Sequence, residues 1–184
     1  MAMTGDNSQN FTSGWVVANG NILRKTKNSK RDLCLIYRTG EMVTLKAAQI
    51  DHKKITDEMD QLWQSFLFGP VLLDENGKAM TKFNTNVGPA NPRSVIGYYE
   101  PGHYCLVQVD GRRTESRLEK GKINVGMTMK QTSALMEQLG CAAAYNLDGG
   151  QSSVLWYNGE NLSNPYNGGR NVMDAVLILD GAVN

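Results

Sequence analysis

A short stretch at residues 146–153, NLDGGQSS, holds residue types that could do chemistry directly after a run of small apolar residues. The carboxylate of Asp148 could act as a base or a nucleophile. Gly149 and Gly150 would let backbone amides approach an anion, and Ser152 and Ser153 would add hydroxyl donors. A simpler interpretation stays open, in which Asp148 only closes a tight turn onto the following amide.

Three arginines lie in loops of the same kind, rich in glycine, proline and asparagine. They are Arg93 in NPR, Arg112 in VDGRR and Arg170 in NPYNGGR, a loop that starts at Asn164. A guanidinium group donates two parallel hydrogen bonds that match a phosphate or a carboxylate. A single arginine of this kind often neutralises a nearby acid or caps a turn. Three in similar loops leave an anion site and separate structural roles as equal alternatives.

A predicted hairpin brings a second carboxylate into this group. Pro101 and Gly102 mark its turn, and residues whose numbers sum to about 203 should then face each other. That register places Arg93 opposite Asp110. Because Asp110 and Asp148 both follow apolar runs and precede glycine, the two acids could serve as the carboxylate pair of a glycoside hydrolase. Two unrelated turns remain the alternative.

Composition excludes several other classes of function. The chain has 184 residues with 19 Lys+Arg and 18 Asp+Glu, so no overall charge favours nucleic acid. No apolar run is long enough to span a membrane, and the first residues do not form a signal peptide. Cys34, Cys105 and Cys141 are dispersed, which predicts buried free thiols and neither a disulfide framework nor a zinc site. His52 and His103 show no sign of a catalytic triad.

The predicted elements indicate one α+β domain over residues 1–184, with a mixed, largely antiparallel sheet. Two main helices are expected at about 56–66 and 128–139, the second with a capping box formed by Thr128 and Gln131. Strands are expected at 14–18, 33–37, 42–45, 71–73, on both sides of the hairpin turn, at 141–147, at 154–159 and at 174–179. We also expect that N-terminal elements of a longer protein are missing.

Taken in order, the motifs resemble those of the phosphodiester glycosidase family. The matching segments cover nearly the whole chain and are FGPVLLDENG (68–77), NPRSVIGY (91–98), VDGRR (109–113), GMTMKQTSALMEQLGCAAAYNLDGGQSS (126–153) and NPYNGGRNVMDAVLIL (164–179). TGDNSQNF near the start resembles the family's opening strand and loop. Two positions depart from the pattern. Gln151 stands where many relatives have glycine, and Asn7-Ser8 stands where an aromatic residue is common.

The resemblance implies hydrolysis of a sugar-1-phosphodiester, on a glycan or a cell-envelope polysaccharide. The implied catalytic residues are Asp148, Asp110, Arg93 and Arg112, and the implied substrate-binding residues are Asp6, Asn7, Gly149, Gly150, Ser152, Ser153, Asn164 and Arg170. Arg93 and Arg112, with Arg170, would hold the phosphate. One aspartate would act at the anomeric carbon, and the roles of Asp110 and Asp148 stay open between them.

The same resemblance leads to several further expectations. No cofactor is required, and no ligand spacing demands a calcium or magnesium ion, although one near the Asp and Asn residues would be compatible. The full-length protein is expected outside the cell or in its envelope. Asp148→Asn and Arg93→Ala should each abolish sugar release and leave the fold intact. The alternative function is a non-catalytic module that binds phosphorylated or anionic glycans.

Overall fold

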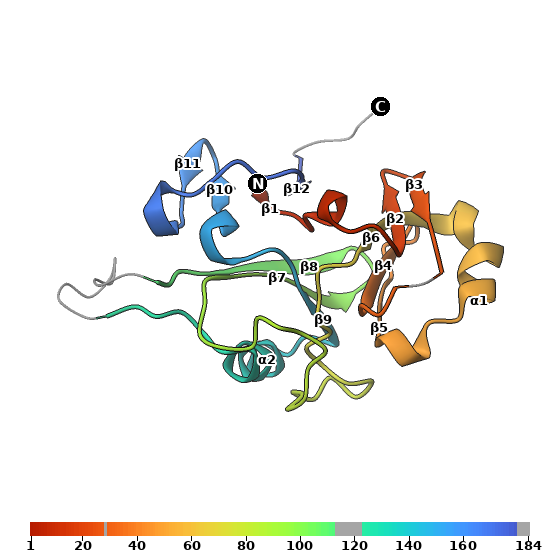
Figure 1. The fold of residues 1–184 in the computed structure, drawn as a ribbon, viewed down its shortest axis with the longest axis horizontal. Helices are drawn as coiled ribbons and strands as arrows, with labels where there is room; N and C mark the ends of the chain where they lie inside the picture. Colours follow the sequence, from red (N-terminus) through yellow and green to blue (C-terminus); the bar gives the residue numbers. More distant parts are fainter. Residues whose placement is uncertain (28, 113–122, 180–184) are drawn as a thin grey trace.

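The fold is described from a computed structural model, which describes residues 1–27, 29–112 and 123–179. Arg113, part of the VDGRR motif, therefore lies outside the described residues. Within the described residues, four small sheets and two α-helices make up an α+β fold, as the sequence predicts (Figure 1). Every strand pairing recorded in these ranges is antiparallel. Within the same ranges, no helix combines the length and the apolar character that crossing a membrane requires.

The central sheet has the strand order β8-β7-β9, with β7 at Arg93–Glu100, β8 at His103–Val109 and β9 at Ala143–Asn146. A second sheet has the order β11-β10-β1-β12 and joins both ends of the chain. Its strands are β1 (Ala2–Thr4), β10 (Leu155–Tyr157), β11 (Glu160–Asn161) and β12 (Ala175–Leu177). These two sheets carry the loops that hold the predicted site.

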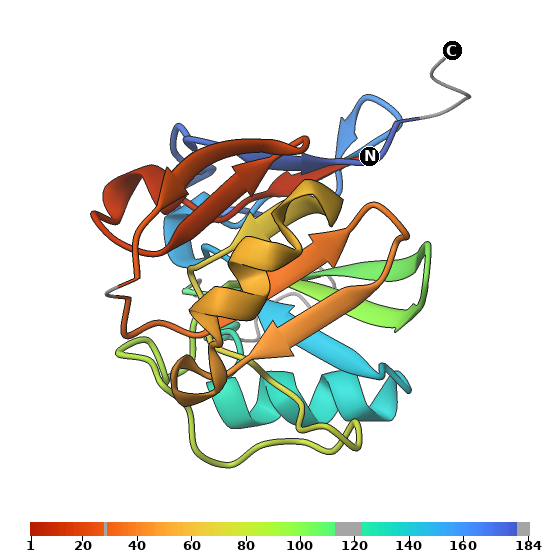
Figure 2. The same cartoon turned by 90° about the vertical axis from the view of Figure 1, so that its right-hand side faces the viewer.

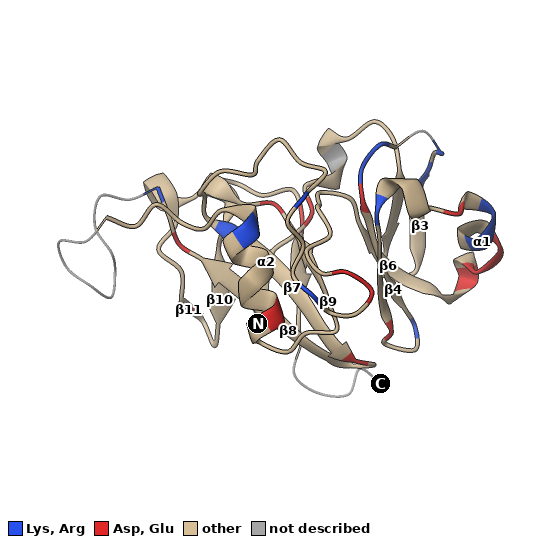
Figure 3. Cartoon of the chain, turned by 90° about the horizontal axis from the view of Figure 1, so that it is seen from below, with Lys and Arg blue, Asp and Glu red and all other residues tan. Residues whose placement is uncertain are grey.

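The other two sheets form the part of the molecule that lies beside α1 in Figure 1. One has the order β5-β4-β6, from β4 (Leu33–Tyr37), β5 (Met42–Leu45) and β6 (Leu62–Phe66). The other pairs β2 (Trp15–Ala18) with β3 (Asn21–Lys25). Trp15, Leu35, Ile55 and Leu62 belong to the apolar cluster between these strands and α1. Charged residues of both signs gather on α1 itself, as expected for a solvated helix (Figure 3).

The predicted helix at 56–66 is wrong over most of its length, because only residues 56–57 of that range belong to an α-helix. The helix α1 spans His52–Asp57 and is capped by the Asp51 carboxylate; a 3₁₀ turn follows at Met59–Gln61, and 62–66 is strand β6. Leu62 and Phe66 are buried while Trp63 is exposed. Pairing with β4 decides this conformation, because β6 forms four residue pairs with an edge of β4 that would otherwise be unpaired. Tertiary pairing thus overrides a local helical pattern.

The second predicted helix is confirmed. Helix α2 spans Met129–Gln138, and Thr128 and Gln131 form the predicted capping box. Gly140 follows the helix at φ 75°, a left-handed conformation that glycine adopts without strain. Met129 and Met136 are fully buried against Val95 and Ala144 of the central sheet. Figure 2 shows α2 running along one side of this sheet.

The predicted register of the hairpin is wrong by one residue. Near the turn Glu100 pairs with His103, but beyond an irregularity between Tyr98 and Glu100 the pair numbers sum to 202. A bulge of this kind adds one residue to one strand and shifts all later pairs. Arg93 therefore faces Val109 instead of Asp110. The segment predicted as a strand at 71–73 forms only isolated bridges, at Val71 and Leu73.

Candidate functional site

Backbone contacts bring the predicted loops together at one end of the central sheet. The Asp148 amide donates to the carbonyl of Gly5 over 3.0 Å, which links the 146–153 loop to the end of β1. The Gly150 amide donates to the Pro92 carbonyl, also over 3.0 Å. The loop that precedes β7 therefore lies directly against the same turn.

Two side-chain contacts join the remaining loops to this group. The Asn164 amide donates to Asp110 Oδ1 over 2.9 Å, so the end of β8 meets the 164–170 loop. Arg112 Nε donates to Asn91 Oδ1 over 2.9 Å. All five predicted loops are thus in direct contact with at least one other, although the loops are far apart in the sequence.

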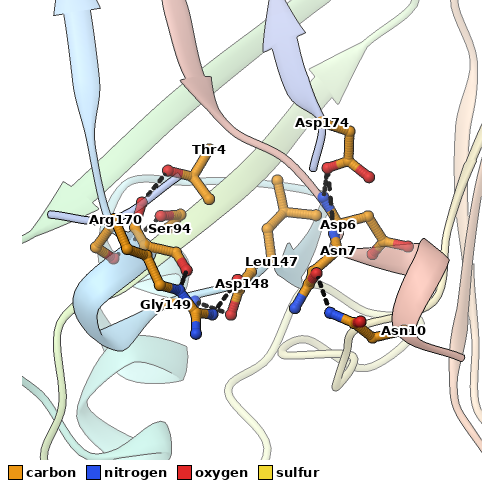
Figure 4. A network of polar contacts seen from close by, with 12 residues as sticks. Thr4, Asp6, Asn7, Asn10, Ser94, Leu147, Asp148, Gly149, Arg170 and Asp174 are labelled. Carbon is orange, nitrogen blue, oxygen red and sulfur yellow. Dashed lines mark hydrogen bonds and ion pairs between the residues drawn. The ribbon is translucent and has the colours of Figure 1, made fainter. Parts of the chain in front are cut away.

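The Asp148 carboxylate is the centre of one polar network (Figure 4). Its Oδ2 lies 3.1 Å from a terminal nitrogen of Arg170, and its Oδ1 accepts the Gly149 amide over 2.9 Å. Arg170 Nε also donates to Ser152 Oγ over 2.6 Å, and the Thr4 hydroxyl donates to the Ser152 carbonyl. The side chain of Asp148 is 8% exposed and that of Arg170 is 50% exposed. A nearly buried carboxylate is therefore held by an arginine that reaches solvent.

The two glycines of the loop are required by close packing. A Cβ atom at Gly149 would lie 2.6 Å from the Pro92 carbonyl oxygen, and Gly150 has a φ of 63°. Their amides already donate to Asp148 and Pro92, as described above. In this structure the two glycines shape the turn at Gly150–Ser152. Their amides are hydrogen-bonded within the chain and do not form an open anion-binding group.

The serines of the loop also have partners inside the chain. Ser152 and Ser153 are both fully buried. Ser153 Oγ lies 3.1 Å from Ser94 Oγ of β7, and Ser152 Oγ accepts from Arg170. Gln151, the unexpected residue of the motif, donates from Nε2 to the Gly169 carbonyl over 2.9 Å. Its side chain thus ties the turn to the loop that carries Arg170.

Arg112 lies against the same turn at Gly150. It is exposed and has a φ of 55°. A Cβ placed on Gly150 would lie 3.3–3.4 Å from its guanidinium, and that group also lies 5.7 Å from the ring centre of Tyr166. Arg112 at Gly150 and Arg170 at Ser152 therefore both lie against the Gly150–Ser152 turn, both reach solvent, and Arg170 also pairs with Asp148.

Arg93 lies in a different environment. It is 2% exposed, and its guanidinium donates to the carbonyls of Met127 and Pro89, with a longer contact of 3.5 Å to that of Gly88. Burial, followed by the charge of Arg112, lowers the pKa of Arg93 to about 10. The side chain therefore holds the loop before β7 to the segment before α2. It also places a second positive charge near Arg112.

Asp6, Asn7 and Asp174 form a neighbouring group (Figure 4). Asp6 is buried, and its two oxygens accept the amides of Leu67 and Phe68 at 2.6 and 2.7 Å. Burial raises the pKa of Asp6, although these two hydrogen bonds oppose the shift. The backbone amides of Asp6 and Asn7 both donate to Oδ1 of Asp174, the residue directly before β12.

Asp110 borders a cavity of about 660 Å³ between β8, α2 and the β10–β11 hairpin. Much of its lining is apolar, including Leu106, Leu135 and Leu162, while Asp110 contributes a carboxylate. Another cavity of about 580 Å³ lies between β6, β8 and β12, and none of the predicted site residues lines it. The first cavity is the one that adjoins the loop cluster.

Several contributors to the cluster were not predicted as site residues, among them Thr4, Asn91, Tyr166 and Asp174. Asn91 and Tyr166 lie inside motifs that the sequence marks, so proximity to Arg93 and Asn164 could have indicated them. Thr4 and Asp174 carry no comparable local signal. Across residues 1–27, 29–112 and 123–179, no three or more His, Cys, Asp or Glu side chains gather in a way that could hold a metal ion.

A family model described as phosphodiester glycosidase matches residues 1–179. The chain belongs to the phosphodiester glycosidase family. The matched range includes all of the loops that meet around Asp148.

Relatives of this phosphodiester glycosidase chain are distant and longer. The SPbeta prophage-derived uncharacterized protein YomE of Bacillus subtilis is 26% identical over 150 residues, which is 80% of this chain and 22% of that protein. The zebrafish N-acetylglucosamine-1-phosphodiester alpha-N-acetylglucosaminidase catalytic domain, solved auto-inhibited by its pro-peptide, is similar with a TM-score of 0.66 at 20% identity. That match covers 89% of this chain and 55% of the zebrafish chain.

A solved structure of a Burkholderia pseudomallei protein that is described as exported has a TM-score of 0.50 at 18% identity. The match covers 83% of this chain and 39% of that one. At these identities the structural matches show a shared fold. The chain spans about a fifth of the curated relative and about half of the zebrafish chain.

Proposed function

We propose that the chain hydrolyses a sugar-1-phosphodiester at the bond between the anomeric carbon and a phosphate oxygen. The observation that carries the proposal is that two solvent-reaching guanidinium groups lie against one turn, Arg112 at Gly150 and Arg170 at Ser152, and that Arg170 also pairs with the Asp148 carboxylate. Guanidinium groups match phosphate oxygens in shape and charge. Membership of the phosphodiester glycosidase family supports the same class of reaction.

In this proposal Arg112 and Arg170 bind the phosphate and stabilise its charge as it leaves the sugar. The repulsion between Arg112 and the buried Arg93 favours an anion at this place, because an anion would offset both positive charges. Arg93 itself is a positioning residue, which supports the site through the loop that it holds in place. Its hydrogen bonds to the carbonyls of Pro89 and Met127 hold the loop on which Gly150 packs.

Asp148 is the carboxylate that we assign to the anomeric carbon, as base or nucleophile. Asp148 contacts Arg170 directly, whereas Asp110 contacts the 164–170 loop by accepting a hydrogen bond from the backbone amide of Asn164. Asp110 would then be the partner carboxylate, at the edge of the cavity of about 660 Å³. Asn7 and Asn164 are polar side chains at the borders of the cluster that could hold sugar hydroxyls.

The substrate that we infer is a phosphorylated glycan, such as a cell-envelope polysaccharide, and the site of action is outside the cytoplasm. This part of the proposal is supported by the family resemblance and by structural similarity to the Burkholderia pseudomallei protein that is described as exported. Fractionation of cells that produce the full-length protein, followed by immunoblotting, would locate it. Recovery in the cytoplasmic fraction alone would contradict the proposed location.

The test of the activity is release of free sugar from a panel of sugar-1-phosphodiesters. For a substrate that the wild type hydrolyses, Asp148→Asn should lower kcat on the order of 10²–10⁴-fold, as expected for loss of a catalytic carboxylate. Arg112→Ala and Arg170→Ala should each lower kcat/KM, since each removes a charge from the phosphate site. Arg38→Ala is the matched control, because Arg38 is also exposed and lies against Trp63.

Each result has a clear meaning if all variants melt near the wild type. Turnover of Asp148→Asn close to that of the wild type would refute the role of Asp148. Binding of the panel compounds by the wild type with no sugar released would refute hydrolysis and favour the glycan-binding module. A loss for Arg38→Ala as large as that for Arg170→Ala would remove the evidence for a local phosphate site.

A further inference from the structure

Two of the cysteines meet, although they are 36 residues apart in the sequence. Cys105 lies on β8, Cys141 lies between α2 and β9, and their sulfur atoms are 3.7 Å apart. That separation is van der Waals contact between two sulfurs, and both thiols are free. The sequence predicts dispersed thiols, so this juxtaposition is created by the fold alone.

Gly97 of β7 makes the contact possible. Strand β7 lies between β8 and β9, and Gly97 pairs with Cys105 on one side and with Ala144 on the other. A Cβ atom on Gly97 would lie 2.6 Å from the sulfur of Cys105 and 2.8 Å from that of Cys141. Both thiols therefore occupy the space that a side chain would fill at this point of the sheet.

The two thiols differ in access to solvent. Cys105 is partly exposed, whereas Cys141 is 3% exposed. Burial raises the pKa of Cys141 to about 11, so its thiolate forms less readily than an ordinary one. Hydrogen bonding with Cys105 and then with Cys141 raises the pKa of Tyr99, whose hydroxyl therefore stays protonated beside the pair. A small reagent would thus meet Cys105 first.

We propose that Cys105 and Cys141 are a modification site, a dithiol pair that a hydroperoxide oxidises to an intrachain disulfide. The inference is independent of the proposed glycosidase activity. The sulfurs must approach from 3.7 Å to about 2.0 Å, with no side chain between them because residue 97 is glycine. The bond would join β8 to the segment that enters β9, across the central strand.

The reaction proceeds in two balanced steps when the oxidant is hydrogen peroxide. The Cys105 thiolate attacks one peroxide oxygen, the O–O bond breaks, hydroxide leaves, and Cys105 becomes a sulfenic acid. The Cys141 thiolate then attacks that sulfur, the S–S bond forms, and the S–O bond breaks with release of the oxygen as water after protonation. Two thiols and one peroxide thus give one disulfide and two waters.

The experiment treats the folded wild-type chain with hydrogen peroxide, removes the oxidant, alkylates in denaturant and maps the peptides. Free thiols should fall from three to one, with Cys34 as the one that remains, because Cys34 is fully buried in a separate apolar cluster. A peptide pair linked through Cys105 and Cys141 should be found, and reduction should restore all three thiols. The oxidised chain should melt at a higher temperature than the reduced chain.

Single variants test the order of the steps. In Cys141→Ser the sulfenic acid on Cys105 has no partner, so labelling of Cys105 by dimedone should rise well above the wild-type level. In Cys105→Ser, Cys141 should stay reduced. The proposal is overturned if wild-type Cys105 and Cys141 both remain open to alkylation, or if dimedone labels Cys105 equally in the wild type and in Cys141→Ser. Conversion of Cys105 to a sulfinic acid while Cys141 stays reduced would also overturn it.

Discussion

Replacing Arg93 with alanine should destabilise the fold, which differs from the expectation drawn from the sequence. The side chain is 2% exposed and donates to the carbonyls of Met127 and Pro89. A hydrogen bond from a charged group contributes about 1.5–3 kcal/mol, and each buried methylene of the stem adds about 0.8 kcal/mol. Relief of desolvation and of repulsion from Arg112 offsets part of this loss. We expect the free energy of unfolding to fall by about 2–4 kcal/mol.

For a chain of this length, such a change lowers the melting temperature by about 5–15 °C. The assay is urea unfolding followed by circular dichroism, with thermal melting as a second measurement. Arg112→Ala is the matched control, because Arg112 is exposed, donates to Asn91 and repels Arg93. It should remain within about 1 kcal/mol of the wild type. The reasoning is refuted if Arg93→Ala unfolds within the same margin.

Three further predictions concern stability. Gly149→Ala should destabilise by about 1–3 kcal/mol in urea unfolding, because its Cβ would lie 2.6 Å from the carbonyl of Pro92; an unchanged midpoint would contradict that contact. Burial raises the pKa of Asp6 in the folded chain above the value of about 3.9 that it has in the unfolded chain. The stability that this shift contributes is therefore fully present below the unfolded pKa and is lost as the pH rises through the folded pKa. The difference in unfolding free energy between wild type and Asp6→Asn should therefore change with pH above about 4, and a constant difference would argue against the shift. Thr128→Ala should lower the melting temperature by the equivalent of about 0.5–2 kcal/mol, because it removes the capping box with Gln131; an equal loss on replacing an exposed mid-helix residue would contradict a specific cap.

Local sequence was sufficient for elements whose cause is local. The helix after Thr128 begins with a capping box and ends before Gly140, and both signals act within a few residues. The strands at 33–37 and 42–45 are likewise as predicted, with a short turn between them. The ordered motifs also indicated the family, because the match depends on residue types in sequence order.

Elements that depend on a distant partner were not predictable in this way. The segment 62–66 has helical spacing, yet it is a strand because β4 offers it an open edge. The hairpin register shifted through a bulge near Tyr98, a single extra residue that no turn signal marks. The supposed pair of Arg93 and Asp110 was lost with that shift.

The sequence by itself determined which loops carry arginine, aspartate and glycine, and the order in which they follow the strands. Only the tertiary structure decided which of these side chains reach solvent. Arg112 and Arg170 both lie against the Gly150–Ser152 turn and reach solvent, whereas Arg93, in a loop of similar composition, is buried among backbone carbonyls. The physical reason is that burial and hydrogen bonding depend on chain segments far apart in sequence. The same reason placed Cys105 against Cys141 above a glycine of the strand between them.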